Sequence, residues 1–187
     1  MVKYNCVKAG LDLAFRKGGQ NTVFAINDYV FYGSGGVCQI IDIQYAPLDG
    51  MPKDRQYYIL HSIHEKNSMM YIPVDSEGVF LRSLISRAEA EDLVKQIPAV
   101  EVVEASNAKA LRDKYYELMK MHAPIEWVRV MKTVQHRMNE PRQIPRKISE
   151  TERSFLENAR KYLYAELSIV LGIPLGEVAQ YIADHTI

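Results

Sequence analysis

Two hydrophobic periodicities divide the chain near residue 85. Up to about Arg82, short runs rich in Val, Ile, Tyr and Phe alternate with Gly, Pro, Asn and Asp, which is typical of short β-strands joined by turns. The pattern predicts four or five strands, drawn from the segments 23–26, 29–32, 37–45, 56–63 and 68–73. Roughly 60 residues of this kind suit a small, strongly bent SH3- or Tudor-like barrel better than a sandwich.

From Ser86 onward the apolar residues recur at helical spacing. Two Ser-x-x-Glu sequences, Ser86 with Glu89 and Ser149 with Glu152, have the spacing of capping boxes at helix starts. The pattern predicts helices near 86–96, 107–121, 124–138 and 150–171, and a last helix after Pro174. The sequence therefore predicts an α+β protein of two domains, a small β barrel followed by an all-α helical domain.

The predicted organisation has three parts. Residues 1–22 are weakly patterned and end near Gly18-Gly19, so we expect an N-terminal extension that is not part of the fold, with the native start near Val23. Residues 23–85 form the β-barrel domain, and residues 86–187 form the helical domain.

Charge is unevenly distributed along a chain that is neutral overall. Residues 23–85 carry four Lys and Arg against seven Asp and Glu, whereas residues 127–161 carry nine Lys and Arg against four Glu. An acidic front half and a basic patch behind it favour two different partners. The alternative for the basic patch is an ordinary solvated helical face.

Several classes of protein are disfavoured by what the sequence lacks. No apolar run approaches the ~18 residues of a membrane span, and the first residues have no continuous signal-peptide core. Cys6 and Cys38 are too few for a disulfide framework, which favours a reducing cytoplasm. We therefore expect a cytoplasmic protein that has no membrane partner.

Catalytic and metal-binding patterns are also missing. His61 and His64 are three residues apart in a predicted strand, where positions i and i+3 point to opposite faces, so no metal site is expected. The chain has no Gly-Lys-Ser/Thr phosphate loop and no Gly-x-Ser-x-Gly elbow. An enzyme with a β-barrel substrate domain would need a nucleophile beside a base, and none is evident. We expect neither an enzyme nor a cofactor.

The only tryptophan, Trp127, stands near two cations in a predicted helix. At about 100° per residue, Arg129 and Lys132 lie about 160° and 140° around the axis from the ring. This arrangement suits a ring that inserts at a nucleic-acid step while cations hold the phosphates on either side. A lone Trp on an amphipathic helix is otherwise an ordinary core residue, and that alternative stays open.

A further cation, Arg153, lies in the first turn after the Ser149 cap. The positive end of a helix dipole does not stabilise a cation, so Arg153 suggests an external anion such as phosphate. Glu150 and Glu152 in the same turn moderate that inference.

Several stretches of the sequence together resemble the CarD/CdnL family of bacterial RNA polymerase-binding transcription regulators. They are INDYVFYGSGGV at 26–37, MYIP at 70–73, and Trp127-x-Arg129-x-x-Lys132 followed by SETER at 149–153 and LENAR at 156–160. The front domain is similar to the polymerase-interacting domain shared with transcription-repair coupling factors. The resemblance covers about residues 23–171.

This resemblance implies a regulator with two contact surfaces. The barrel would bind the RNA polymerase β subunit through an exposed strand edge at Tyr71, Ile72 and Pro73, a form of β-strand addition. The helical domain would lie on promoter DNA, as a monomer, at the upstream edge of the melted region. Trp127 would be a minor-groove wedge that stabilises the open complex, and Arg129, Lys132 and Arg153 would contact the DNA backbone.

A second interpretation is a sequence-specific DNA-binding regulator. Residues 167–178, with a turn at Gly172, have the layout of a helix-turn-helix. The helix that follows contains Glu177 and Asp184 but no Lys or Arg, which argues against reading bases in the major groove.

Overall fold

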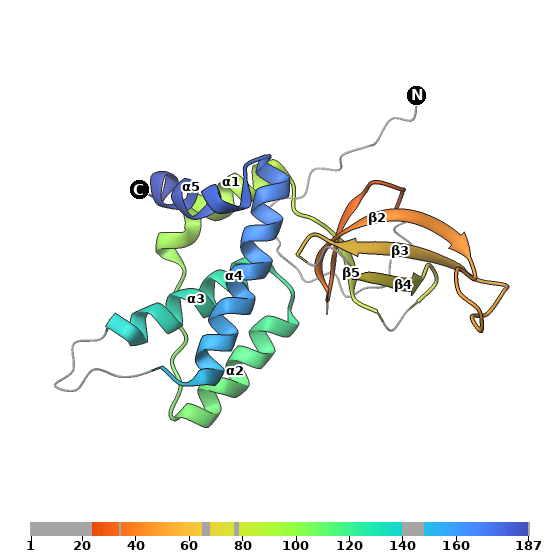
Figure 1. The fold of residues 1–187 in the computed structure, drawn as a ribbon. Helices are drawn as coiled ribbons and strands as arrows, with labels where there is room; N and C mark the ends of the chain where they lie inside the picture. The colour runs from red at the N-terminus through yellow and green to blue at the C-terminus, as the bar shows by residue number, and fades with distance from the viewer. Residues whose placement is uncertain (1–23, 34, 65–67, 77–78, 140–147, 187) are drawn as a thin grey trace.

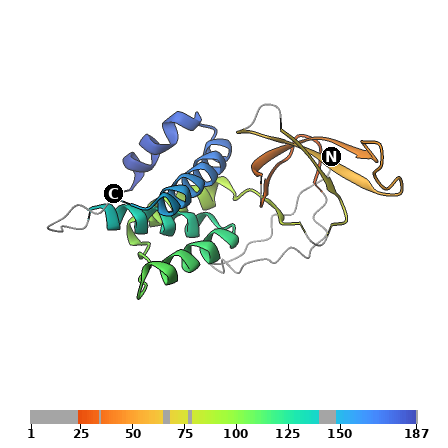
Figure 2. The same cartoon turned by 60° about the horizontal axis from the view of Figure 1, so that its bottom comes forward.

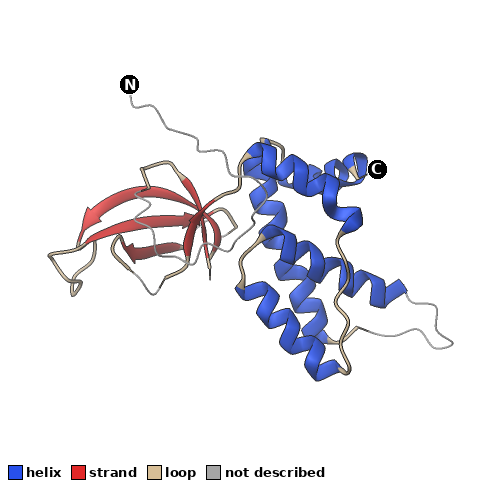
Figure 3. Ribbon diagram, turned by 180° about the vertical axis from the view of Figure 1, so that it is seen from behind, coloured by secondary structure: helices blue, strands red, loops and turns tan. Residues whose placement is uncertain are grey.

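The protein consists of two lobes, one made of strands and one of helices (Figure 1). The computed structural model describes residues 24–33, 35–64, 68–76, 79–139 and 148–186. The predicted N-terminal extension lies outside these residues. Seen from behind, all the strands lie in one lobe and all the helices in the other (Figure 3), which agrees with the predicted α+β class.

The strand lobe is a five-stranded antiparallel sheet. Its strands are β1 (Tyr29–Tyr32), β2 (Gly36–Tyr45), β3 (Gln56–Ser62), β4 (Met69–Pro73) and β5 (Leu81–Ser83). The order across the sheet is β4-β3-β2-β1-β5, so β4 and β5 are its two edges. The prediction of a closed barrel is not confirmed, because no pairing joins these edge strands within the described residues.

The strand expected at 23–26 is not formed by the residues described there, and β5 was not anticipated. The chain turns at Asn27, whose φ is 76°, and the Asp28 carboxylate accepts a hydrogen bond from the backbone N–H of Ala25. Phe24 instead packs edge-on to Tyr58 in the core of the sheet lobe, with ring centroids 5.9 Å apart.

A bulge between Ile40 and Asp42 bends β2, the longest strand. The bend lets the ten residues of β2 pair with β1 at one end and with β3 along most of the strand. Buried side chains on the concave side form the smaller core of the protein: Phe24, Val30, Cys38, Ile40, Tyr58, Leu60 and Ile72.

The helical lobe matches the periodicity of the sequence closely. Its helices are α1 (Arg87–Gln96), α2 (Ala108–Lys120), α3 (Pro124–Asn139), α4 (Glu150–Leu171) and α5 (Val178–His185), with short 3-10 turns η1 (Ile97–Ala99) and η2 (Leu175–Glu177). Both predicted capping boxes are present, at Ser86 and Ser149. Asn107 caps α2 by accepting the N–H of Ala110.

The end of α4 is a sharp turn. Gly172 adopts a left-handed φ of 69°, and α4 makes an angle of 111° with the following Leu175–His185 segment. No single helix among the described residues is long and apolar enough to cross a membrane, although this bent pair passes on combined length and composition.

The two lobes share the larger hydrophobic core. Phe31 of β1 and Val37 of β2 are fully buried among the apolar side chains of α1, α2, α3 and α4. The turned view shows α4 running from the far side of the helical lobe toward the sheet (Figure 2). Since one core spans both lobes, the sheet and the helices form a single packed unit.

Candidate functional site

The Trp127 ring lies inside the shared core and has no solvent-exposed surface. Its centroid is 4.9 Å from that of Phe31 and 5.6 Å from that of Tyr162. The prediction that Trp127 is a DNA wedge is therefore wrong, and the alternative of a core residue is confirmed. The physical reason is that β1 supplies Phe31 to the face of α3 that carries the ring.

The cations predicted to flank the ring have partners within the protein. The Lys132 ammonium donates to the carbonyl oxygens of Ile97 and Pro98, each at 2.8 Å, at the C-terminal end of α1 where the helix dipole favours a cation. Arg129 forms an ion pair with Glu126 one turn earlier. We correct the prediction accordingly: Lys132 is a capping residue, and Arg129 is partly neutralised.

Arg153, the remaining cation of the predicted DNA-binding set, does lie at the surface. Its side chain is 52% exposed, and its Nε is 3.8 Å from the carboxylate of Glu150. An exposed pair of this kind contributes little to stability. Arg153 remains open to an external anion, although it does not form one surface with the buried Trp127.

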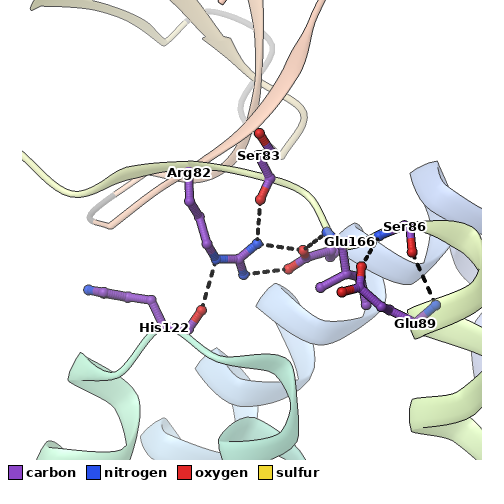
Figure 4. Close-up of polar contacts among 7 residues, drawn as sticks. Arg82, Ser83, Ser86, Glu89, His122 and Glu166 are labelled. Atoms are coloured by element: carbon purple, nitrogen blue, oxygen red, sulfur yellow. Dashed lines mark hydrogen bonds and ion pairs between the residues drawn. The ribbon is translucent and has the colours of Figure 1, made fainter. Parts of the chain in front are cut away.

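A buried ion pair joins the lobes, between Arg82 of β5 and Glu166 of α4 (Figure 4). The guanidinium donates two hydrogen bonds to the carboxylate, at 2.6 and 2.8 Å. The Glu166 side chain is wholly buried, and one of its oxygens also accepts the N–H of Ile85 at 2.9 Å. A bidentate pair with an additional donor is the geometry that makes a buried carboxylate tolerable.

Arg82 also contacts the helical lobe through its planar group. The Arg82 Nε donates to the His122 carbonyl oxygen at 3.0 Å, at the junction of α2 and α3 (Figure 4). Its guanidinium lies 4.7 Å from the ring centroid of Phe31 and 5.7 Å from that of Trp127. This arrangement was not predicted from the sequence, because Arg82 and Glu166 are 84 residues apart.

His122 lies beside this ion pair. Its ring packs 4.4 Å from Phe80 and 5.5 Å from Phe31. Burial, together with the nearby positive charge of Arg82, lowers the pKa of His122 below its usual value. The imidazole is therefore neutral at physiological pH, as its position between the lobes requires.

The edge strand β4 exposes backbone groups on one side of the sheet. Val74 donates its N–H to the Gln56 carbonyl on β3, and Ser62 donates to that of Ser68. Because antiparallel pairs alternate, the even-numbered residues of β4 bond to β3, while the N–H and C=O of Tyr71 point away from it. No described strand covers this edge.

The three residues predicted to contact polymerase are placed differently along β4. The Tyr71 side chain lies on the outer face and its backbone on the free edge. The Ile72 side chain is buried in the core of the sheet lobe, so it is unavailable to a partner. Pro73 ends the strand and has no N–H to donate.

An exposed basic stripe runs along α2, a surface that we did not predict. It consists of Lys109, Arg112, Tyr116 and Lys120, which recur at intervals of three and four residues and therefore share one face. The three cations make no ion pair or hydrogen bond among the described residues. The signal was present in the sequence as helical spacing, but Trp127 had directed the prediction to α3.

A groove separates this stripe from α4. One hollow of about 300 Å³ lies beside Lys109 and Arg112 at the start of α4, and a second of about 210 Å³ lies beside Tyr116 and Lys120. We call this surface the α2–α4 groove. Gly33, in the turn between β1 and β2, borders the second hollow, which therefore lies where the two lobes meet.

Reactive groups are few in the described part of the chain. Burial raises the pKa of the Cys38 thiol to about 12, so it remains protonated and unreactive. No three His, Cys, Asp or Glu side chains of the described residues are grouped so as to hold a metal ion. The arrangement favours binding surfaces over catalysis.

A small, bent, open antiparallel sheet with a free edge strand is a suitable framework for binding another protein by strand addition. The sequence model of the CarD-like/TRCF RID domain matches residues 24–85. The front lobe is therefore a CarD-like RNA polymerase-interacting domain, and it connects the protein with transcription regulation. The match covers 62 of the 187 residues and none of the helices. No curated protein matches the chain significantly.

Proposed function

We propose that this protein is a non-enzymatic transcription regulator that binds the RNA polymerase β subunit and stabilises the open promoter complex. The free edge of β4 in a CarD-like RNA polymerase-interacting domain carries this proposal. The sheet lobe binds polymerase, and the helical lobe contacts promoter DNA. The shared core keeps the two binding surfaces in a fixed relation.

Polymerase docking by strand addition makes a specific demand on Tyr71. Replacing it with proline removes the outward N–H and hinders an incoming strand, while the hydrogen bonds of β4 to β3 are left in place. We expect Tyr71→Pro to weaken binding to the isolated β subunit at least tenfold, measured by surface plasmon resonance. An unchanged affinity would contradict docking at this edge.

The matched control is Tyr71→Ala, which keeps the backbone N–H. If main-chain pairing provides most of the affinity, Tyr71→Ala binds within a few fold of the wild type. Equal losses in both variants would assign the contact to the tyrosine side chain instead.

DNA contact in this proposal moves from α3 to α2. Four cations and two acids make α2 net positive, and the exposed stripe contains three of these cations. Phosphate contacts of this kind position a protein on DNA without reading its sequence. Docking on polymerase would raise the effective concentration of the stripe at the promoter, so a modest intrinsic affinity is sufficient.

The salt dependence of DNA binding tests the stripe. Each phosphate contact contributes about 0.9 to the slope of log affinity against log salt. For Lys109→Ala/Arg112→Ala we expect a shallower slope, by about two, on duplex DNA in fluorescence anisotropy. The same variant should bind polymerase normally and lose most of the effect on open-complex lifetime.

The charge-matched control is Lys53→Ala/Arg55→Ala, in the exposed connection between β2 and β3. It removes the same charge from the sheet lobe and should leave the slope unchanged. If both double variants reduce the slope equally, net charge alone would account for DNA binding and the stripe would have no special role.

The helix-turn-helix alternative has a suitable bend but not suitable chemistry. The 111° angle between α4 and the last segment lies in the range of such motifs. Residues 175–187 contain Glu177 and Asp184 but no Lys or Arg, so α5 offers no cation to phosphates. Charge therefore favours α2 as the DNA-contacting element.

A further inference from the structure

The smaller hollow of the α2–α4 groove has the composition of a binding site for a flat ring. Its walls include three aromatic side chains, Tyr116 from α2 and Phe155 and Tyr162 from α4. The Tyr116 ring is 51% exposed and stands edge-on to Phe155, with centroids 4.8 Å apart. A ring held by its edge in this way keeps a face open for stacking.

Polar groups around this hollow suit a nucleobase attached to a phosphate backbone. Asn158 contributes a side-chain amide, which both donates and accepts hydrogen bonds as base edges do. Lys120 lies at the rim on the same stripe as Lys109 and Arg112. The volume of about 210 Å³ is below the roughly 300–1,000 Å³ of pockets for drug-sized ligands, which limits an occupant to a small ring system.

We propose that the hollow formed by Tyr116, Phe155, Asn158 and Tyr162 binds an unpaired base of single-stranded DNA, with Lys120 on the adjoining phosphate. Bases in a duplex are stacked and cannot enter a recess, so the site selects melted DNA. Stacking on aromatic side chains is tolerant of sequence, because every base has a π-face. This inference rests on the proposed function and supplies the preference for an open complex that the buried Trp127 does not.

The position of the hollow is consistent with this role. Gly33 borders it from the sheet lobe, where an added Cβ would lie only 3.2 Å from the His122 ring. The ion pair between Arg82 and Glu166 fixes the lobes beside it. In the proposed complex, polymerase docking on β4 would present the hollow to the melted strand in one orientation.

Binding of a single-stranded oligonucleotide that carries one 2-aminopurine tests the site. Stacking quenches the fluorescence of this base, so we expect quenching on binding by the wild-type chain and weaker quenching with the matched duplex. Loss of one stacked base typically weakens binding about 5- to 100-fold, which is the loss expected for Tyr116→Ala. Asn158→Ala should give a smaller loss in the same assay.

The control is Tyr45→Ala, which removes an equally large side chain, 63% exposed, from the sheet lobe. It should bind as the wild type does. Circular dichroism checks that each variant is folded. If Tyr116→Ala and Asn158→Ala both match the wild type, or if duplex binds as tightly as single strand, the inference is overturned.

Two further arms separate this inference from other outcomes. Displacement of the oligonucleotide by deoxyadenosine monophosphate at similar concentrations would assign the hollow to a free nucleotide and overturn the strand-binding proposal. Failure of single-strand binding, with binding to the β subunit and salt-dependent duplex binding intact, would reject the hollow and leave the proposed function standing. Loss of those two activities in the wild-type chain would reject both.

Discussion

Replacing Trp127 with alanine should lower the free energy of unfolding by about 3–5 kcal/mol, the range for large aromatic residues in a packed core. The ring is fully buried between Phe31 of the sheet and Tyr162 of α4, so its removal leaves a cavity where the two lobes meet. Urea titration followed by far-ultraviolet circular dichroism measures the loss. A midpoint equal to that of the wild type would contradict the core position.

The conservative control is Trp127→Phe. A phenyl ring keeps the contacts with both aromatic neighbours and removes an indole N–H that has no hydrogen-bond partner within the described structure. We therefore expect a much smaller loss than with alanine. Comparable losses would indicate that ring size, rather than aromatic contact, determines the stability of this junction.

The same tryptophan also reports on the wedge mechanism. Because Trp127 is the only tryptophan, its fluorescence describes this position alone. We expect weak quenching by acrylamide in the free protein and with DNA added. Strong quenching in either state would show that the ring reaches solvent and would restore the wedge as a mechanism.

Removing Arg82 should be as costly as removing Trp127. Arg82→Ala leaves the Glu166 carboxylate buried without its counter-charge, and such a change typically lowers the free energy of unfolding by about 3–5 kcal/mol. Additional contacts are lost, since Arg82 also donates to the His122 carbonyl and lies over Phe31. Thermal and urea unfolding measure the change.

The double variant Arg82→Met/Glu166→Leu distinguishes charge from packing. Replacing both members of a buried pair with apolar residues of similar size is often neutral or stabilising. We expect the double variant to be clearly more stable than Arg82→Ala, because no unpaired carboxylate remains. If the two variants are equally destabilised, the ion pair is not the reason that Arg82 matters.

Binding assays on that double variant address orientation. A bidentate pair fixes geometry as well as charge, so apolar replacements keep the lobes together with less restriction on their angle. In the proposed function, such a variant would bind the β subunit and DNA separately but stabilise open complexes less well.

The sequence by itself determined the local elements of this protein. Capping boxes at Ser86 and Ser149, the left-handed turn at Gly172 and the periodic apolar residues specify helices through interactions within a few residues. The resemblance of the opening strands and of the 70–73 segment to CarD-like proteins was confirmed by the match to residues 24–85. Such signals lie in short stretches and are readable one segment at a time.

Only the tertiary structure decided which faces meet. Helical spacing placed Trp127 and its flanking cations on α3, but periodicity cannot say that β1 covers the ring or that Lys132 caps a helix that ends 35 residues earlier. The open sheet edge at β4 and the pairing of Arg82 with Glu166 likewise depend on contacts between distant segments. The physical reason is that burial is a property of the packed assembly, since the same amphipathic residues can face either solvent or another element.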